Sequence, residues 1–216
     1  MTGLDAEDVF ALLDWKRRMF DAYRDVRAAS DPRESWRGWR AVRDDLFAGH
    51  PQSPIPEGER SSFRGLPYFD YDPGWRVLAS VRDAPPERYD IATSGEAGGS
   101  YRFTRFAVAS FELGDSPRVG PIDLELYWLE GYGGGLFVPF RDGTSGKETY
   151  GAGRYVLDTV KGADLGTEGD RLVLDFNFAY NPSCAYDPQW VCPLAPPPNR
   201  LSVPIRAGER YVSPMA

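Results

Sequence analysis

Apolar and charged positions in the first fifty residues recur at the spacing of two α-helices. The first predicted helix runs from Ala6 to about Ala29 and follows Asp5, whose carboxylate can cap its first turn. Its apolar positions lie three or four residues apart, which predicts a stripe along one side of the helix. The stripe comprises Val9, Leu12, Leu13, Phe20, Tyr23 and Val26, and charged residues cover the other face.

The second predicted helix has the clearest local start signal in the chain. Asp31 can cap it, Pro32 takes the first helical position and Glu34 takes the third, an arrangement that satisfies the open amide groups of a first turn. Gly49 followed by Pro51 ends it. Its predicted inner side carries Trp36, Trp39, Val42 and Leu46.

After a proline-rich linker, the period of the apolar positions changes to two. Residues 51–74 contain this linker and the aromatic segment FRGLPYFDYDPGW, which we expect to dock on the rest of the chain. From Trp75 onward, apolar and polar residues alternate between turns rich in Gly, Asp and Pro. The predicted strands lie near residues 75–81, 101–113, 121–130, 135–141, 153–160, 171–178 and 201–206.

The strand connections contain no helical stretch that could serve as a parallel crossover. We therefore predict a mainly β fold, an antiparallel β-sandwich or barrel-like body with two N-terminal α-helices packed on it. The expected parts are a helical pair at 1–50, the linker and docking segment at 51–74 and the β domain at 75–216, together forming one compact unit. In the strand at 171–178, Asp175 and Asn177 should point the same way, opposite an apolar face.

Composition and charge exclude several classes of protein. A net charge of −7 argues against a nucleic-acid partner, because such partners are held mainly by Lys and Arg. Of the 25 basic residues only Lys16, Lys147 and Lys161 are lysines. The arginines reflect either genome composition or recognition of carboxylate or phosphate groups.

The N-terminal thirty residues lack an apolar run with a cleavage site, so we do not expect a signal peptide. No window approaches the roughly 18 to 20 apolar residues that a membrane-spanning helix requires. We expect a soluble, cytoplasmic protein that has no membrane partner.

The loop at residues 141–154 combines glycines, hydroxyl groups and basic side chains. Arg141, Thr144, Tyr150 and Arg154 are its candidate ligand-binding residues, because backbone amides and guanidinium groups can hold an anion. Phosphate-binding loops of the familiar kinds precede a helix, whereas a strand follows this loop. The alternative is a long hairpin in which Arg141 pairs with Asp142 or Glu148.

A second group of polar residues follows the strand at 171–178. Asp175, Asn177, Tyr180 and Asn181 could converge on the floor of a cleft, and Arg200 lies further along the chain. Asp175 is the candidate general base. Structural pairing of Asp175 with Arg154 or Arg200 is the alternative.

Cys184 and Cys192 lie near Tyr186, and three interpretations of the two cysteines compete. A zinc site normally needs four ligands, and His50 is the only histidine, so we predict no metal site. A disulfide fits the spacing but not a reducing compartment. The third interpretation is buried or reactive thiols, with Cys184 as a candidate nucleophile, although cysteine hydrolases usually need a histidine.

Three segments carry a resemblance to a known family. FVPFRDGTSGKETYGAGRY, LDFNFAYNPSCAYDPQWVCPLAPPPNRLSVPIRAGE and the earlier FRGLPYFDYDPGWRV are similar to the uncharacterised bacterial family called domain of unknown function 1684, over roughly residues 10 to 210. The resemblance implies soluble bacterial proteins that are mostly β with a helical N-terminus. It implies no activity.

These observations favour a protein that binds, and in one version turns over, a small polar or anionic metabolite in a cleft at the strand ends. Three arginines would hold the anion, Asn177 and Asn181 would orient it, and Tyr186 would add to the wall. The alternative is a non-catalytic scaffold or protein-interaction module in which the polar cluster is structural. The sequence indicates no cofactor, although a coloured flavin or haem protein is a third option, and it does not indicate an oligomeric state.

Overall fold

Two α-helices open the chain where the sequence predicts them. The computed structural model describes residues 5–92, 100–113 and 120–211. Helix α1 spans Ala6–Ala28 and helix α2 spans Pro32–Gly49. Both predicted caps are confirmed, since the Asp5 carboxylate accepts a hydrogen bond from the Glu7 amide and the Asp31 carboxylate accepts from the first turn of α2.

The predicted apolar stripe on α1 is only partly buried. Four of its six members are exposed, with Val9, Leu12, Leu13 and Phe20 each at 37–49%. The buried side of α1 instead carries Met19, Ala22 and Tyr23. The apolar spacing identified a helix correctly, but the neighbouring elements cover α1 only from about Trp15 onward.

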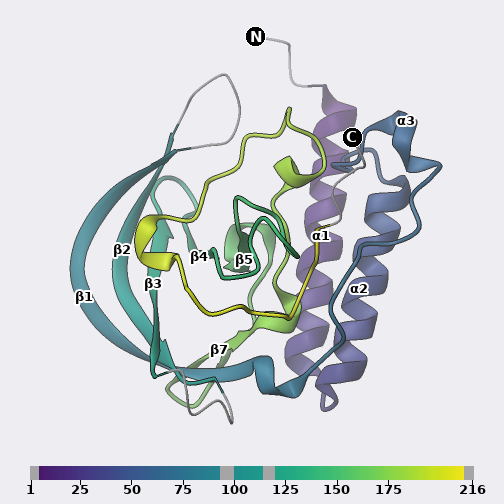
Figure 1. The fold of residues 1–216 in the computed structure, drawn as a ribbon. Coiled ribbons are helices and arrows are strands. Elements are labelled where there is room, and N and C mark those ends of the chain that lie inside the picture. Colours follow the sequence, from purple (N-terminus) through teal and green to yellow (C-terminus); the bar gives the residue numbers. More distant parts are fainter. Residues whose placement is uncertain (1–4, 93–99, 114–119, 212–216) are drawn as a thin grey trace.

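Seven antiparallel strands form one sheet that curls around the interior of the molecule (Figure 1). The strand order is β5-β4-β3-β2-β1-β7-β6. The bounds are β1 (Arg76–Ala92), β2 (Ser100–Phe111), β3 (Ile122–Leu129), β4 (Gly135–Phe140), β5 (Arg154–Asp158), β6 (Thr167–Glu168) and β7 (Arg171–Asp175). The predicted barrel-like antiparallel body with two N-terminal helices is confirmed as a half-barrel, with comparable amounts of helix and strand.

Strand β1 is much longer than the predicted strand at 75–81. Its pairing with β2 shifts register between Asp83 and Glu87 and then continues to Ala92. Pro85 and Pro86 lie within this irregularity, where a residue without an amide hydrogen is tolerated. Adjacent prolines usually mark a turn in a sequence, but here they lie inside a strand that continues.

Two predictions near the C-terminus are wrong. Strand β7 ends at Asp175, and residues 176–178 form a 3-10 turn. Residues 201–206 form no strand, because the backbone groups of Leu201 and Val203 bond to the loop at 141–143 and those of Ile205 bond to side chains. The Ile205 amide donates to the Asp142 carboxylate at 3.2 Å, and the Ile205 carbonyl accepts from Arg154 at 2.9 Å.

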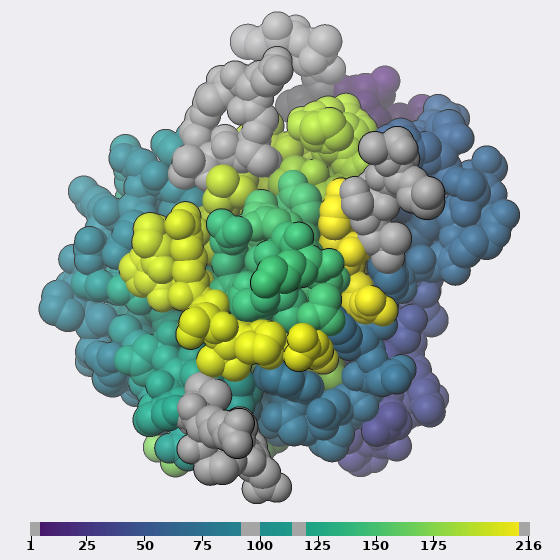
Figure 2. Space-filling view, viewed as in Figure 1, coloured from purple at the N-terminus to yellow at the C-terminus, as the bar shows by residue number. Residues whose placement is uncertain are grey.

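The C-terminal segment closes the open side of the curl (Figure 1). On this face the loop at 141–154, in green, lies in the centre and is bordered by the yellow C-terminal residues (Figure 2). Backbone bonds join the two segments, including Arg141 N to Asn199 O and Tyr211 N to Glu148 O, both at 3.0 Å. The loop is therefore bordered on this face by chain that follows it by about sixty residues.

Helix α2 and the docking segment pack against the interior of the sheet. Trp39 of α2 is 1% exposed, and its ring centroid lies 5.1 Å from that of Phe178. The linker contains a short helix, α3 (Glu57–Arg60), and Tyr68 then forms a bridge with Glu209. Among the described residues, no helix has the length and apolar character needed to cross a membrane.

Candidate functional site

Arg154, a predicted anion-binding residue, lies in the interior at 1% exposure. Its guanidinium group donates to the Asp142 carboxylate at 2.8 Å and to the carbonyl groups of Ile205, Ala207 and Glu209. Burial lowers the pKa of this guanidinium, and the Asp142 carboxylate opposes that shift. All of these acceptors belong to the protein, so Arg154 holds the C-terminal segment on β5.

Glu209 is the centre of a second buried group, and it is not among the residues predicted for the site. It is 0% exposed and accepts hydrogen bonds from Arg43 at 2.8 Å, from the Asn181 amide at 3.1 Å and from the Tyr186 hydroxyl. Burial raises the pKa of Glu209 to about 7, while Arg43 opposes the shift. Two predicted ligand-binding residues, Asn181 and Tyr186, thus meet around a carboxylate of the chain itself.

Asp175 and Asn177 also bond to protein groups. Asp175 accepts from the amide and the side chain of Asn177, at 2.9 and 2.8 Å. Asn177 exchanges two hydrogen bonds with the backbone of Asp72 and accepts one from Trp36 at its carbonyl. Asn177 therefore fastens α2 and the docking segment to the end of β7.

Asp175 is the one predicted site residue with a carboxyl group, and the pKa of that group is shifted. Burial raises its pKa to about 6, and the hydrogen bonds from Asn177 oppose the shift. It lines a hollow of about 180 Å³ that Arg27, Arg76 and Glu168 also line. Its predicted role as a general base stays a prediction.

The other predicted residues of the 141–154 loop, Arg141, Thr144 and Tyr150, each contact a different part of the protein. Arg141 and Arg200 are joined through a backbone bridge. Thr144 is fully buried and its hydroxyl lies 2.8 Å from that of Thr149. The Tyr150 hydroxyl donates to the Cys184 carbonyl at 3.2 Å.

Cys184 and Tyr180 each contact a residue, Cys192 and Asp158 respectively, that lines a cavity. The Cys184 amide donates to the sulfur of Cys192 at 3.4 Å, and the Tyr180 hydroxyl lies 3.4 Å from the Asp158 carboxylate. The two cysteines are buried and are not joined by a disulfide. A hydrogen bond between their side chains, together with burial, raises the pKa of the Cys192 thiol.

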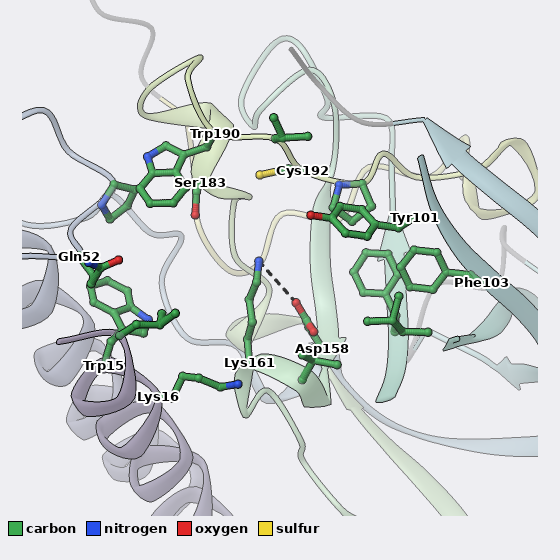
Figure 3. A pocket seen from close by; sticks show the side chains of 17 residues that line it. Trp15, Lys16, Gln52, Tyr101, Phe103, Asp158, Lys161, Ser183, Trp190 and Cys192 are labelled. Carbon is green, nitrogen blue, oxygen red and sulfur yellow. Dashed lines mark ion pairs between the residues drawn. The ribbon is translucent and has the colours of Figure 1, made fainter. Parts of the chain in front are cut away.

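The cavity has a volume of about 400 Å³ and lies between α1, the concave side of the sheet and the segment at 183–193 (Figure 3). Most of its wall is aromatic or aliphatic. The apolar lining residues are Leu12, Trp15, Pro54, Tyr101, Phe103, Leu129, Phe137, Val160, Trp190, Val191 and Pro193. Pockets of this size and apolar character commonly bind small molecules.

The polar lining is small and includes an ion pair. Lys161 lies 3.8 Å from Asp158, and Lys16 reaches toward the same space from α1 (Figure 3). Burial raises the pKa of the Asp158 carboxyl, and Lys161 opposes that shift. Gln52, Ser183 and Cys192 complete the polar lining. These groups could fix the orientation of a ligand whose body lies against the apolar wall.

None of the predicted ligand-binding residues lines this cavity. The sequence did single out Cys192 and two of the lining residues, Lys16 and Lys161, but only as a cysteine and as rare lysines. The cavity combines residues from α1, the linker, four strands and the 183–193 segment, and no local pattern joins them. Among the described residues, no group of three or more His, Cys, Asp or Glu side chains is placed to hold a metal ion.

Comparisons with known proteins give a family and no activity. The model of the family described as protein of unknown function DUF1684 matches residues 61–210. An uncharacterised protein of Haloarcula marismortui, solved by solution NMR, is 39% identical, with a TM-score of 0.57, over 81% of this chain and 91% of that one. That relative is archaeal, so the bacterial origin implied by the resemblance stays a prediction. No curated protein matches the sequence. The chain belongs to the DUF1684 family of proteins of unknown function.

Proposed function

We propose that this protein binds a small molecule in the cavity between α1, the concave side of the sheet and the segment at 183–193. The observation that carries the proposal is the cavity of about 400 Å³, whose wall is mainly apolar and includes a few polar groups. Such a wall gives affinity through burial of apolar surface, and the polar groups give orientation.

The contacts of the polar cluster support a structural role for most of it. The Arg154 guanidinium, the Glu209 carboxylate and the Asn177 amide group each make several hydrogen bonds to protein groups. A ligand would have to displace these bonds in a buried region, which is costly. This supports the predicted alternative for the cluster and moves the proposed ligand site to the neighbouring cavity.

The network also holds the wall of the cavity. The Tyr155 hydroxyl donates to the Pro193 carbonyl at 2.6 Å, and the Cys184 amide donates to Cys192. The 183–193 segment is thus held by one hydrogen bond to β5 and by another within the segment itself. A wall held by hydrogen bonds keeps the space open in the absence of a ligand, which lowers the cost of binding.

The competing proposal is a scaffold or protein-interaction module that has no small ligand. A substitution that fills the cavity separates the two. Val191→Trp enlarges a side chain that lines the cavity and is 42% exposed, whereas Val81→Trp makes the same change at a residue of β1 that is 43% exposed and does not line it. The two positions are matched in residue type and exposure.

The test measures binding of decan-1-ol, decanoate and decylamine by calorimetry and by the shift in melting temperature. We expect at least one probe to bind the wild-type protein and Val81→Trp with equal affinity, and Val191→Trp to lose that binding. The proposal is refuted if no probe saturates, or if the two tryptophan variants bind equally.

We also propose a cytoplasmic location for the protein. The two buried cysteines support it, because both are thiols in the structure, as is usual in a reducing compartment. Fractionation of the native cells tests this, and recovery of the protein outside the cytoplasm would refute it.

A further inference from the structure

The charges in the cavity differ in sign from the charge of the whole chain. The net charge of the protein is −7. The charged residues that line the cavity are Lys16, Lys161 and Asp158, which leaves one positive charge in excess. A locally positive cavity in an acidic protein selects for an anion.

The basic residues that line the cavity are lysines, which are rare in this chain. Only three of the 25 basic residues are lysines, and two of the three line this cavity. No arginine is among the lining residues. Arginine favours phosphate and paired recognition through its planar fork, whereas lysine acts as a compact charge on a flexible stem.

The two lysines come from separate elements and are held differently. Lys161 follows the end of β5, and its ammonium group lies 3.8 Å from the Asp158 carboxylate and 5.8 Å from the centre of the Tyr155 ring. Lys16 lies on α1 and forms no ion pair with any residue that the structure describes. The Tyr180 hydroxyl also approaches Asp158, at 3.4 Å. The cavity lining therefore contains one carboxylate and two ammonium groups.

An apolar ligand that filled this cavity would remove water from both lysines. Asp158 can pair with one of them, but the other ammonium group would lose part of its hydration without gaining a partner, which is unfavourable. A ligand that brings its own carboxylate removes this cost and forms a charge-assisted hydrogen bond.

We infer that the ligand is an amphipathic monocarboxylate, whose apolar body lies against the aromatic and aliphatic wall and whose carboxylate binds Lys16 and Lys161. The inference rests on the proposed function and adds the chemical class of the ligand to it. At about 30 Å³ for each non-hydrogen atom, the share of a water molecule in the liquid, the cavity holds roughly a dozen such atoms. Decanoate, with ten carbon atoms and two oxygen atoms, matches that size.

The test compares three probes that share one chain and differ in the charge of the end group: decanoate, decan-1-ol and decylamine. Each is titrated by calorimetry into the wild-type protein and into Lys16→Met, Lys161→Met and Lys147→Met. Methionine keeps an unbranched side chain and removes the charge. Lys147 is the matched control, because it is the one lysine that does not line the cavity.

We expect decanoate to bind the wild-type protein at least tenfold more tightly than decan-1-ol. Lys16→Met and Lys161→Met should each weaken decanoate binding about five- to tenfold without weakening decan-1-ol binding, while Lys147→Met should alter neither. If Lys161→Met fails to fold because Asp158 loses its partner, Lys16→Met and the charge reversal Lys16→Glu decide the question. Charge reversal should weaken decanoate more than Lys16→Met does.

The outcomes separate this inference from the proposed function. Equal binding of decanoate and decan-1-ol overturns the inference, and so does a preference for decylamine, which would assign recognition to Asp158. In both cases the cavity still binds a small molecule and the proposed function stands. Absence of saturable binding by all three probes refutes the proposed function itself.

Discussion

Replacement of Arg154 by methionine tests whether the polar cluster is structural. Arg154 is 1% exposed and Asp142, its ionic partner, has a fully buried side chain. Methionine fills a similar volume but donates no hydrogen bond. The variant therefore leaves the Asp142 carboxylate without its cation and removes a donor from three backbone carbonyls.

The size of the loss follows from these contacts. Removal of one partner from a buried ion pair costs about 3–5 kcal/mol. Each buried carbonyl left without a donor costs about 1–3 kcal/mol more. The sum is comparable with the whole stability of a typical domain, about 5–15 kcal/mol, so we expect Arg154→Met to be largely unfolded or to unfold at a much lower urea concentration.

Urea unfolding followed by tryptophan fluorescence measures this loss, because six tryptophans report on the fold. Arg141→Met is the control. Arg141 is partly exposed, and its side chain makes no hydrogen bond to any residue that the structure describes, so its loss should cost under about 1 kcal/mol. Adding Asp142→Asn to Arg154→Met should recover part of the stability, since it removes the unpaired charge.

The structural interpretation fails if Arg154→Met unfolds within about 1 kcal/mol of the wild-type protein. It also fails if Arg141→Met is the more destabilising of the two. Either result would return Arg154 to the ligand-binding role predicted from the sequence.

Two further predictions concern buried polar groups. Burial raises the pKa of Asp175 from 3.8 to about 6, so the folded protein keeps a proton there that the unfolded chain releases. Stability should therefore fall as the pH rises from about 4 to 6, by up to about 3 kcal/mol at roughly 1.4 kcal/mol for each pKa unit. Urea unfolding across this range should show a fall that is smaller by this amount in Asp175→Asn, because Glu209 and Asp158, whose pKa values burial also raises, keep their own contributions; an unchanged fall in the variant would contradict the assignment. Asn199 is fully buried and bonds to the backbones of Glu125 and Pro139, so Asn199→Ala should cost several kcal/mol, about 1–3 for each group left unsatisfied. A loss below about 1 kcal/mol would show that water replaces the amide.

The helices and most strands were predictable because their signals are local. The Asp31 cap and Pro32 set the start of α2, and the change of period at Trp75 sets the start of the sheet. The end of β1 was not predictable, because Pro85 and Pro86 resemble a turn but lie in an irregular part of a continuing strand. The strand continues past the prolines because β2 supplies its hydrogen-bonding partner.

The C-terminal segment shows a different limit. Residues 201–206 alternate like a strand, and Ile205 is indeed buried, but its backbone bonds to Asp142 and Arg154. Alternation of apolar and polar residues predicts which side chains are buried, but it does not predict which groups form hydrogen bonds with the backbone. The partner residues lie about fifty to sixty positions earlier in the sequence.

The polar cluster was predictable as a list of residues and not as a site. The sequence identified Arg154, Asn177 and Asn181 as polar groups at strand ends, where ligand-binding residues are common. The same positions are where a C-terminal segment must be fastened to a curled sheet. Sequence patterns cannot separate these two uses, because the difference lies in the partner, here Glu209, Asp72 and the carbonyls of residues 205–209.

The arrangement of network and cavity is consistent with a division between structural residues and the proposed ligand-binding residues. The 183–193 segment forms a wall of the cavity, and it is held at one end near Asn181 by Glu209 and at the other by Tyr155 through Pro193. Because these bonds use protein groups alone, the wall does not need a ligand to stay in place. The two lysines take no part in them. Substitutions in the network should therefore change the unfolding midpoint first, whereas substitutions of the lysines should change the Kd for a carboxylate first. If the proposed function holds, stability and affinity should depend on different residues, and measuring both on each variant separates the residues that hold the cavity open from those that bind the ligand.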